Sequence, residues 1–443
     1  MAEKKSSAIP EFYKKTPAER LQAVKDFASL SDEEAKALRD WGALGEATAR
    51  GMIENTVGTT ALPLGFATNF LVNGKDYLIP MALEEPSVVA AASNAAKLCR
   101  PSGGFKCDSD ESVMIGQMQF VRAANSGASV LAAVKKVNAA RTKLCAMANE
   151  CDATLCSFGG GCRDLRARAL ETPRGEMLVV EIFVDVRDAM GANCVNSMCE
   201  RLAPAIAEVT GVEARLRIVS NLATRRLSRA KAVWKARDLE ESFKDSESRE
   251  SRLTGKQIVE RVLDAWAFAA ADAHRACTHN KGIMNGVDAA LVACGQDWRA
   301  MEAGCHAYAA TVVPGKYSPL TRFEATDASD LVGFIELPTQ VGVVGGATRT
   351  HSVARACLKV LGVKSSREFG EVLAAVGLAQ NFAALRALAT EGIQRGHMEL
   401  HARNIAILAG AKGDEVELVA SKLVESRCVK VDKARELLER IRG

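Results

Sequence analysis

A lysine between an asparagine and a glycine is the first feature of this sequence that could do chemistry. Lys281 lies in THNKGIMNG, and the next acidic residue, Asp288, follows seven positions later. No carboxylate at helical spacing can therefore neutralise the ammonium. Asn280 and Asn285 offer neutral amides of the kind that orient a polar ligand. The lysine either extends from the surface into solvent or meets a negative charge brought from elsewhere.

Three carboxylates are candidate partners for this ammonium: Glu84, Glu85 and Asp297. A glutamate ahead of a helix ordinarily caps it. Two adjacent glutamates ahead of an almost wholly apolar helix allow one to cap while the other points into a cleft. Asp297, in CGQDWRA, could likewise cap the helix that follows it. Both interpretations stay open from the residues alone.

Two histidines at i, i+4 spacing, His397 and His401 in GHMELHARN, share one face of a predicted helix. A zinc site would require HExxH, whereas Glu399 is two positions after the first histidine and faces away. Proton donation by one histidine suits this residue type better, because histidine titrates near neutral pH. Core packing of both is the alternative, and metal analysis would test a zinc-dependent hydrolase.

Three glycine-rich stretches could present backbone N–H groups to phosphate: SFGGGCRD (157–164), DAMGAN (188–193) and VGVVGGATRTH (341–351). The second leads from a predicted strand into a predicted helix, whose dipole would add to the attraction. Tight turns explain each stretch about as well.

The elements that must position these residues begin with short helices and a hairpin. Capping boxes at Thr16–Glu19 and Ser31–Glu34 predict two helices. Asn73-Gly74 between apolar runs predicts a β-hairpin. EEPSVVAAASNAAKLCR then predicts a helix with Pro86 in its first turn and a stop at 101–104.

From about residue 113 to 220 the periodicity alternates between strand and helix in the order β-α-β-β-α-β. This order predicts a ferredoxin-like domain inserted into the rest of the chain. It is not a Rossmann pattern, because no GxGxxG follows a strand here. A non-enzymatic nucleotide- or RNA-binding module is the distant alternative, but the strands are largely aliphatic, whereas RNA binders of this shape carry exposed aromatic residues.

The second half of the chain is mainly helical. The mixed charge run at 235–252 predicts a solvated helix or loop. A helix over 254–276 precedes GIMNGVDAALVAC (282–294), whose small residues predict a closely packed central helix. Three short amphipathic helices follow from about 394.

Composition excludes several classes of protein. A length of 443 residues predicts two or three domains, and 58 basic against 54 acidic residues leave no electrostatic case for nucleic acid or an anionic membrane. Thirteen scattered cysteines predict reduced thiols. No apolar run reaches the roughly 18 residues of a spanning helix, and the N-terminus lacks a signal-peptide core. We expect a cytoplasmic protein.

Taken together, the motifs resemble the class II 3-hydroxy-3-methylglutaryl-coenzyme A (HMG-CoA) reductases, the soluble type of bacteria and archaea. The resemblance runs from about residue 10 to the end. EEPS at 84–87 is the class II form of a region that differs in the membrane-anchored enzymes. It rests on ENTVGTTALPLGFATNFLVNGKDYLIPMALEEPSVVAAAS, DVRDAMGANCVNS, HNKGIMNGVDAALVACGQDWRAMEAGCHAYA, VGVVGGATRTH and LAQNFAALRALATEGIQRGHMELHARN. The resemblance implies interconversion of HMG-CoA and mevalonate plus coenzyme A, with two nicotinamide dinucleotides per turnover.

The resemblance also assigns roles. A buried Lys281 ammonium would stabilise the oxyanion, with Glu85 transferring protons, Asp297 orienting the lysine and His397 protonating the departing thiolate. Four further residues match positions near the HMG portion or the catalytic groups: Ser87, Arg275, Asn285 and Gln380. The matching cofactor segment comprises Asp188, Met190, Gly191, Ala192 and Asn193.

The implied cofactor is NAD(H), with NADP(H) as the alternative. Asp152 matches an acidic residue that faces the adenosine ribose in the NAD-using members, and a carboxylate repels a 2′-phosphate. Arg163 could instead receive that phosphate. NAD(H) use would make mevalonate degradation plausible, whereas NADPH would favour mevalonate synthesis for isoprenoids.

The domain organisation that follows is α+β. A large, mainly helical substrate-binding domain (1–112 and 221–393) would surround a central helix, with the ferredoxin-like cofactor domain inserted at 113–220. A helical flap (394–443) would close over the site. The resemblance implies a homodimer with shared active sites, commonly three dimers together.

Overall fold

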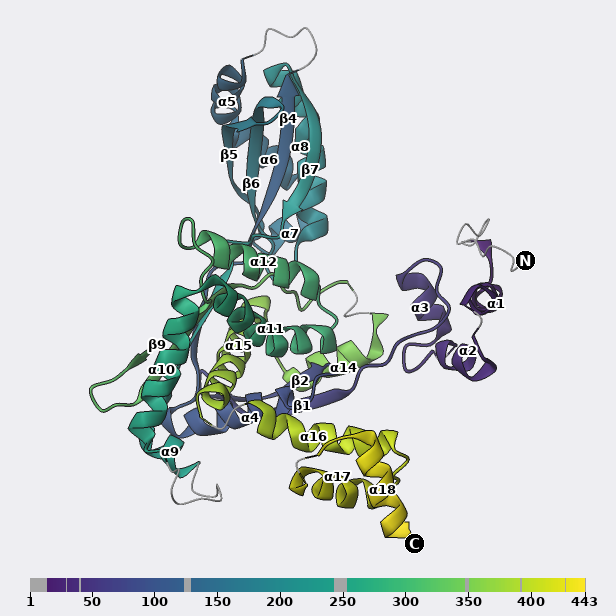
Figure 1. The fold of residues 1–443 in the computed structure, drawn as a ribbon. Helices are drawn as coiled ribbons and strands as arrows, with labels where there is room; N and C mark the ends of the chain where they lie inside the picture. Colours follow the sequence, from purple (N-terminus) through teal and green to yellow (C-terminus); the bar gives the residue numbers. More distant parts are fainter. Residues whose placement is uncertain are drawn as a thin grey trace.

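The computed structural model describes residues 14–28, 30–39, 41–122, 129–242, 253–346, 350–390, 393–426 and 428–442. The architecture is α+β, as predicted, and within the described ranges most buried hydrophobic residues belong to three clusters. The first fills the part that we call the body, which is built from the elements between Leu64 and Ser109 and between Leu227 and Ala389. The second lies in the sheet inserted between Val113 and Ser220, and the third joins the C-terminal helices. Figure 1 shows the inserted sheet projecting from one end of the body and the C-terminal helices at the other. The proposed domain limits stay a prediction.

From residue 14 onward the described chain first forms an arm of three helices, which lies apart from the body (Figure 1). They are α1 (Pro17–Ala28), α2 (Asp32–Leu38) and α3 (Glu46–Met52). The first predicted capping box is present, because Thr16 N donates to Glu19 Oε2 at 2.7 Å and Glu19 N donates to Thr16 Oγ1 at 3.3 Å. The side chain of Glu34, which belongs to the second box, lies outside the described residues.

The predicted hairpin joins β1 (Leu64–Val72) to β2 (Lys75–Ala82). Asn73 and Gly74 have φ of 50° and 83°, the positive values that a tight hairpin turn of this type requires. Helix α4 (Val88–Cys99) covers the hairpin, and Thr68 N donates to Ser93 Oγ at 3.0 Å. The chain then turns at 100–102, as the predicted stop requires.

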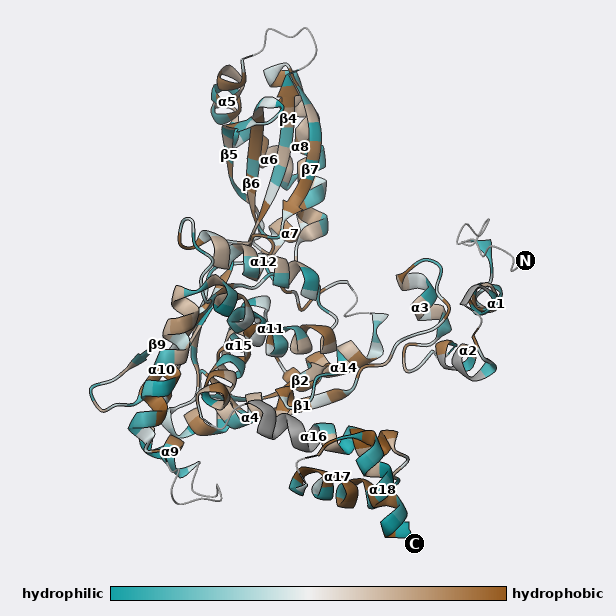
Figure 2. Cartoon of the chain, viewed as in Figure 1, coloured by the Kyte–Doolittle hydropathy of each residue, from teal (hydrophilic) through white to brown (hydrophobic). Residues whose placement is uncertain are grey.

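The inserted sheet has the predicted ferredoxin-like topology. Its strand order is β5-β6-β4-β7 and every neighbouring pair is antiparallel. Hydrophobic stretches run along its strands in Figure 2. The elements are β4 (Val113–Arg122), α5 (Val130–Ala139), α6 (Arg141–Asn149), α7 (Ala153–Ser157), β5 (Gly161–Thr172), β6 (Gly175–Asp185), α8 (Ala192–Thr210) and β7 (Val212–Ser220).

A second four-stranded sheet belongs to the body and is not among the predicted elements. Its order is β3-β8-β10-β9, so the two strands that flank the insertion in sequence, β3 and β8, lie side by side. The strands are β3 (Lys106–Ser109), β8 (Leu227–Trp234), β9 (Thr321–Ala325) and β10 (Leu331–Pro338). The pairing closes the base of the insertion.

Two long helices fill the centre of the body. They are α11 (Ala273–Ala293) and α15 (Ser366–Ala389), which approach closely because a Cβ at Gly377 would lie only 3.0 Å from Ile283 Cγ2. By length and composition α15 could span a membrane, but 67% of its apolar window is buried inside the protein, as in a core helix. Around them lie α9 (Ala236–Glu241), α10 (Gly255–Ala271), α12 (Trp298–Thr311) and α14 (Ser352–Leu361).

The boundaries of α11 correct the sequence analysis. A helix over 254–276 followed by a separate one over 282–294 was expected, but the break falls at Asp272. Asp272 caps α11 by accepting from Arg275 N at 2.8 Å. Lys281 therefore lies inside a helix, and Gly282 does not interrupt it because the surrounding core stabilises the helix more than one glycine weakens it.

The C-terminal helices are α16 (Ile393–Leu408), α17 (Glu415–Glu425) and α18 (Val431–Arg442). They agree in number and position with the three helices predicted from about 394. Their own cluster includes Ala402, Val419 and Leu438, all buried.

Candidate functional site

The structure pairs Lys281 with Glu85. Lys281 Nζ, from α11, donates to Glu85 Oε2 at 3.0 Å, across 196 positions of sequence. The lysine side chain is 58% exposed and that of the glutamate 35%. In the single chain the ammonium is therefore accessible, which differs from the buried ammonium expected from sequence. An accessible pair of this kind contributes only about 0–1 kcal/mol to stability.

The turn before α4 keeps Glu85 available for this contact. Neither Glu84 nor Glu85 caps the helix; the N-cap is Ser87, which makes no side-chain capping bond and has φ of 73°. A left-handed serine is strained, and such strain is common where a side chain must be held for function. The prediction of Pro86 in the first helical turn is wrong for the same reason, since the chain reverses at Ser87 before helix geometry begins.

One stripe of α11 is accessible while the rest is buried. Lys281, Asn285 and Asp288 share this stripe, at spacings of four and three residues. Asn280 is on the opposite side, fully buried, where its Nδ2 donates to Ser318 O at 2.9 Å. Its predicted role as a ligand-orienting amide is therefore wrong, because the side chain is used to hold a loop.

Asp288 lies on the same stripe of α11, and no sequence pattern assigned it a role. Its Oδ1 is buried and has no hydrogen-bond partner within the described part of the chain. Burial, and secondarily the nearby carboxylate of Glu302, raises the pKa of Asp288 to about 7. An acidic residue inside the small apolar helix GVDAALVAC was the available signal.

The predicted substrate residues lie along or beside α11. Gln380 is 5% exposed and its Oε1 has no partner in the described residues, and a Cβ at Gly286 would lie 3.2 Å from that oxygen. Arg275, whose pKa is lowered by burial, lines a hollow of about 450 Å³. This hollow is also lined by Arg261, Asp264, Ala265, Phe268, Leu388 and Ala389.

The structure does not bring Asp297 to Lys281. Asp297 caps α12, accepting from Ala300 N at 3.1 Å, and its carboxylate lies 3.5 Å from Arg299. Its neighbour Gln296 accepts from Gly342 N at 2.9 Å. Asp297 therefore lies where the body meets the inserted sheet.

The predicted cofactor segment forms the strand-to-helix turn at 188–193. Gly191 is the N-cap of α8 with φ of 103°, and no side chain caps the helix. The first N–H groups of α8 are thus available to an anion, and the helix dipole favours a phosphate there. Asp188 fixes the start of the turn, because its Oδ1 accepts from Ser366 N at 2.8 Å.

Asp152 and Arg163 lie beside the same turn. Asp152 caps α7 by accepting from Leu155 N at 2.8 Å. Burial raises the pKa of Cys194, in the first turn of α8, to about 11, and the negative charge of nearby Asp152 adds to this shift. Arg163 donates to Asp185 Oδ2 at 2.9 Å. This ion pair uses only Nη2 of the guanidinium, and the Arg163 side chain is 46% exposed.

The histidine predictions fall partly outside the described residues. His397 lies in α16, but its side chain is outside the description, whereas His401 is exposed. Within the described parts of the chain no group of three or more histidine, cysteine, aspartate and glutamate side chains could hold a metal ion.

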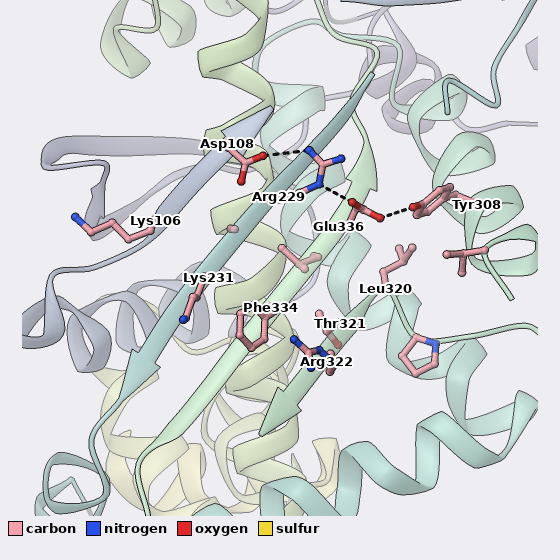
Figure 3. A pocket seen from close by; sticks show the side chains of 14 residues that line it. Lys106, Asp108, Arg229, Lys231, Tyr308, Leu320, Thr321, Arg322, Phe334 and Glu336 are labelled. Carbon is pink, nitrogen blue, oxygen red and sulfur yellow. Dashed lines mark hydrogen bonds and ion pairs between the residues drawn. The ribbon is translucent and has the colours of Figure 1, made fainter. Parts of the chain in front are cut away.

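A hollow of about 580 Å³ lies on the outer face of the body's sheet, shown in Figure 3. Lys231 and Arg322 flank the ring of Phe334, at 5.1 and 4.5 Å from its centroid. Arg229 pairs with Glu336 at 2.6 Å. None of the predicted site residues lines this hollow, so its volume does not mark the site.

An α+β body that holds a lysine–glutamate pair, joined to a ferredoxin-like sheet with an uncapped helix N-terminus, is the arrangement of a dinucleotide-dependent enzyme of non-Rossmann type. The sequence model of the hydroxymethylglutaryl-coenzyme A reductases matches residues 16–402. The chain belongs to this family and has its oxidoreductase function.

Relatives place the chain with the class II enzymes. The 3-hydroxy-3-methylglutaryl-coenzyme A reductase of Archaeoglobus fulgidus is 54% identical over 438 residues, covering 99% of this chain and 95% of the relative. The class II reductase of Streptococcus pneumoniae, solved bound to NADPH in open conformations, superposes with a TM-score of 0.72 at 37% identity, covering 97% of this chain and all of the other. A second structure of the pneumococcal enzyme has the same TM-score and identity over 98% of this chain and 99% of its own.

Proposed function

We propose that this chain interconverts HMG-CoA and (R)-mevalonate plus coenzyme A by two successive hydride transfers through a mevaldehyde-level intermediate. The observation that carries the proposal is the 3.0 Å contact between Lys281 Nζ and Glu85 Oε2 on an accessible stripe of the core helix. A nicotinamide dinucleotide, when bound, supplies or accepts the hydride.

The chain's own residues supply charge stabilisation and protons. Each reduction leaves negative charge on a carbonyl oxygen, and the Lys281 ammonium stabilises it where it forms. Glu85, already hydrogen-bonded to that ammonium, passes the proton to or from the same oxygen. His397, carried on α16, protonates the coenzyme A thiolate as it leaves.

The position of Asp297 changes how its role is proposed. In the single chain its carboxylate contacts Ala300 N and Arg299 rather than Lys281. We expect it to act on the site from the boundary between body and inserted sheet. Ser87, Arg275, Asn285 and Gln380 would hold the HMG portion and the neighbouring thioester.

NAD(H) is the proposed cofactor. Asp152, close to the first turn of α8, would accept a hydrogen bond from the 2′-hydroxyl of the adenosine ribose. Arg163, which could otherwise attract a 2′-phosphate, already donates to Asp185. The pneumococcal relative was solved with NADPH, so NADP(H) is the alternative and both must be compared. An NAD(H) preference would favour mevalonate degradation, which growth on mevalonate with and without the gene would test.

We also propose a cytoplasmic homodimer with shared sites, three dimers together. Lys281 is exposed in the single chain, whereas hydride transfer requires water to be excluded. The arm and the hairpin expose large apolar side chains of the kind that interfaces bury. They are Met52, Ile53, Leu62, Leu64, Phe66 and Leu78. Light scattering on the purified chain would measure the assembly.

The decisive experiment is a spectrophotometric assay of coenzyme A-dependent NAD⁺ reduction with mevalonate, and of NADH oxidation with HMG-CoA. We expect two dinucleotides consumed per HMG-CoA. No turnover with either dinucleotide in either direction would contradict the proposal.

A further inference from the structure

Arg226 lies where the chain returns from the inserted sheet to the body, between the end of β7 at Ser220 and the start of β8 at Leu227. Its side chain is only 3% exposed. No motif marked this residue in the sequence. The mechanism proposed above makes no use of it.

The guanidinium joins the 188–193 turn to the body. Arg226 Nη1 donates to Ala189 O at 3.2 Å and to Met190 O at 3.1 Å, while Nη2 donates to Ala189 O at 3.2 Å and to Val341 O at 2.5 Å. One planar fork therefore fixes two successive peptide groups of the turn and a third from the body.

Among the described residues, the buried guanidinium of Arg226 has only neutral hydrogen-bond partners. Within the described chain no carboxylate lies at ion-pair distance from Arg226, and burial lowers its pKa to about 10 although Asp185 and Asp188 oppose the shift. The group is therefore charged at neutral pH. A buried cation satisfied only by carbonyl oxygens is costly, and apolar residues would fill the same space more cheaply.

The rest of the turn is tightly seated. Val343 N donates to Asp188 O at 2.9 Å, and a Cβ at Gly342 would lie 2.6 Å from Met190 N. These contacts hold Asp188 and one side of Met190. Arg226 holds the carbonyl oxygens of Ala189 and Met190, immediately ahead of Gly191 and the free N-terminus of α8.

We propose that Arg226 is a positioning residue for the dinucleotide: it holds the turn so that the N-terminus of α8 faces the cofactor's phosphates. In a trans peptide the N–H points opposite to the C=O, so the Gly191 N–H points away from the guanidinium. The positive charge behind the turn adds to the helix dipole. The inference rests on the proposed role of the 188–193 turn.

The test compares Arg226→Lys and Arg226→Gln with the wild-type enzyme and with Arg229→Lys. Arg229 lies three positions later, on β8, and pairs with Glu336 and Asp110, so it controls for loss of a nearby arginine that does not contact the turn. We expect the KM and the dissociation constant for the dinucleotide to rise about tenfold or more in Arg226→Gln, and less in Arg226→Lys, which keeps the charge. The KM for HMG-CoA should change by less than about twofold.

Each outcome decides one of two questions. A proportional loss for both substrates, or unchanged dinucleotide binding in a folded Arg226→Lys, would overturn the positioning role. Should Arg226→Gln fail to fold, Arg226→Lys alone carries the test, with its melting temperature compared with that of Arg229→Lys.

Asn193→Asp tests the turn itself, because the new carboxylate would repel the phosphates of the dinucleotide. If this change leaves dinucleotide binding intact, the proposed cofactor segment is wrong. If it weakens binding while Arg226→Lys does not, only the role of Arg226 fails.

Discussion

Two positive charges in this protein, Lys281 and Arg226, are handled in opposite ways. Lys281 is 58% exposed and contacts one carboxylate, whereas Arg226 is 3% exposed and contacts three carbonyl oxygens. A group that must release its partner when charge develops on a substrate gains from an accessible, weak pairing. A group that must hold backbone in one shape gains from burial and several neutral acceptors. The difference separates a candidate catalytic cation from a positioning one.

The largest expected effect comes from Lys281→Ala. Loss of the oxyanion partner should lower turnover by about 10³-fold or more. Unfolding by urea should shift little, because an exposed ion pair contributes about 0–1 kcal/mol. Lys359→Ala, an exposed lysine on α14, is the matched control. Near wild-type turnover of the Lys281 variant would remove the lysine from the chemistry and end its contrast with Arg226.

A subunit-mixing experiment tests whether Lys281 and the 188–193 turn that Arg226 holds act in one site from two different subunits. Lys281→Ala and Asn193→Asp subunits, each inactive alone, are co-expressed and purified through two different tags. If a site combines Lys281 of one subunit with the 188–193 turn of its partner, one of the two sites in each mixed dimer keeps both wild-type parts, so activity should return to about half of wild type. No recovery in verified mixed dimers would show that one chain supplies both.

Asp152→Asn should change cofactor choice by a smaller amount. Asparagine keeps the cap of α7 and removes the charge that repels a 2′-phosphate. The ratio of kcat/KM for NADH over NADPH should fall about tenfold. Asp164→Asn, on strand β5 of the inserted sheet, controls for loss of a carboxylate elsewhere in this part of the chain. An unchanged ratio would place the discrimination elsewhere.

The smallest effect concerns Asp288, which is less exposed than Lys281 and less buried than Arg226. Its pKa is raised to about 7, so the folded state binds this proton more tightly than the unfolded state. Stability from this group is therefore lost as pH rises from about 4 to about 7. Asp288→Asn should be more stable than wild type by about 1–3 kcal/mol at pH 8 and nearly equal at about pH 4, by urea unfolding. Equal stability at both values would refute the shift.

Local pattern was enough to predict much of the fold. Asn73-Gly74, the Thr16–Glu19 box and the strand and helix order of 113–220 all appear as predicted, because each depends on neighbours within a few residues or on a regular period. The resemblance of whole motifs led to the correct family. The sheet β3-β8-β10-β9 was not predictable in this way, because its strands lie on both sides of the insertion and no tight turn joins β3 to β8.

The amino-acid sequence by itself determined which residue types are available for chemistry: an ammonium, several carboxylates and a glycine turn leading into a helix. Only the tertiary structure decided their partners. Lys281 and Glu85 meet across 196 positions, and Arg226 reaches Val341 across 115. Contacts at such separations depend on how the whole core packs, and no local spacing encodes them. That is why the role of Asp297 beside Lys281 stays a prediction, and why no local pattern assigned a role to Arg226 or Asp288.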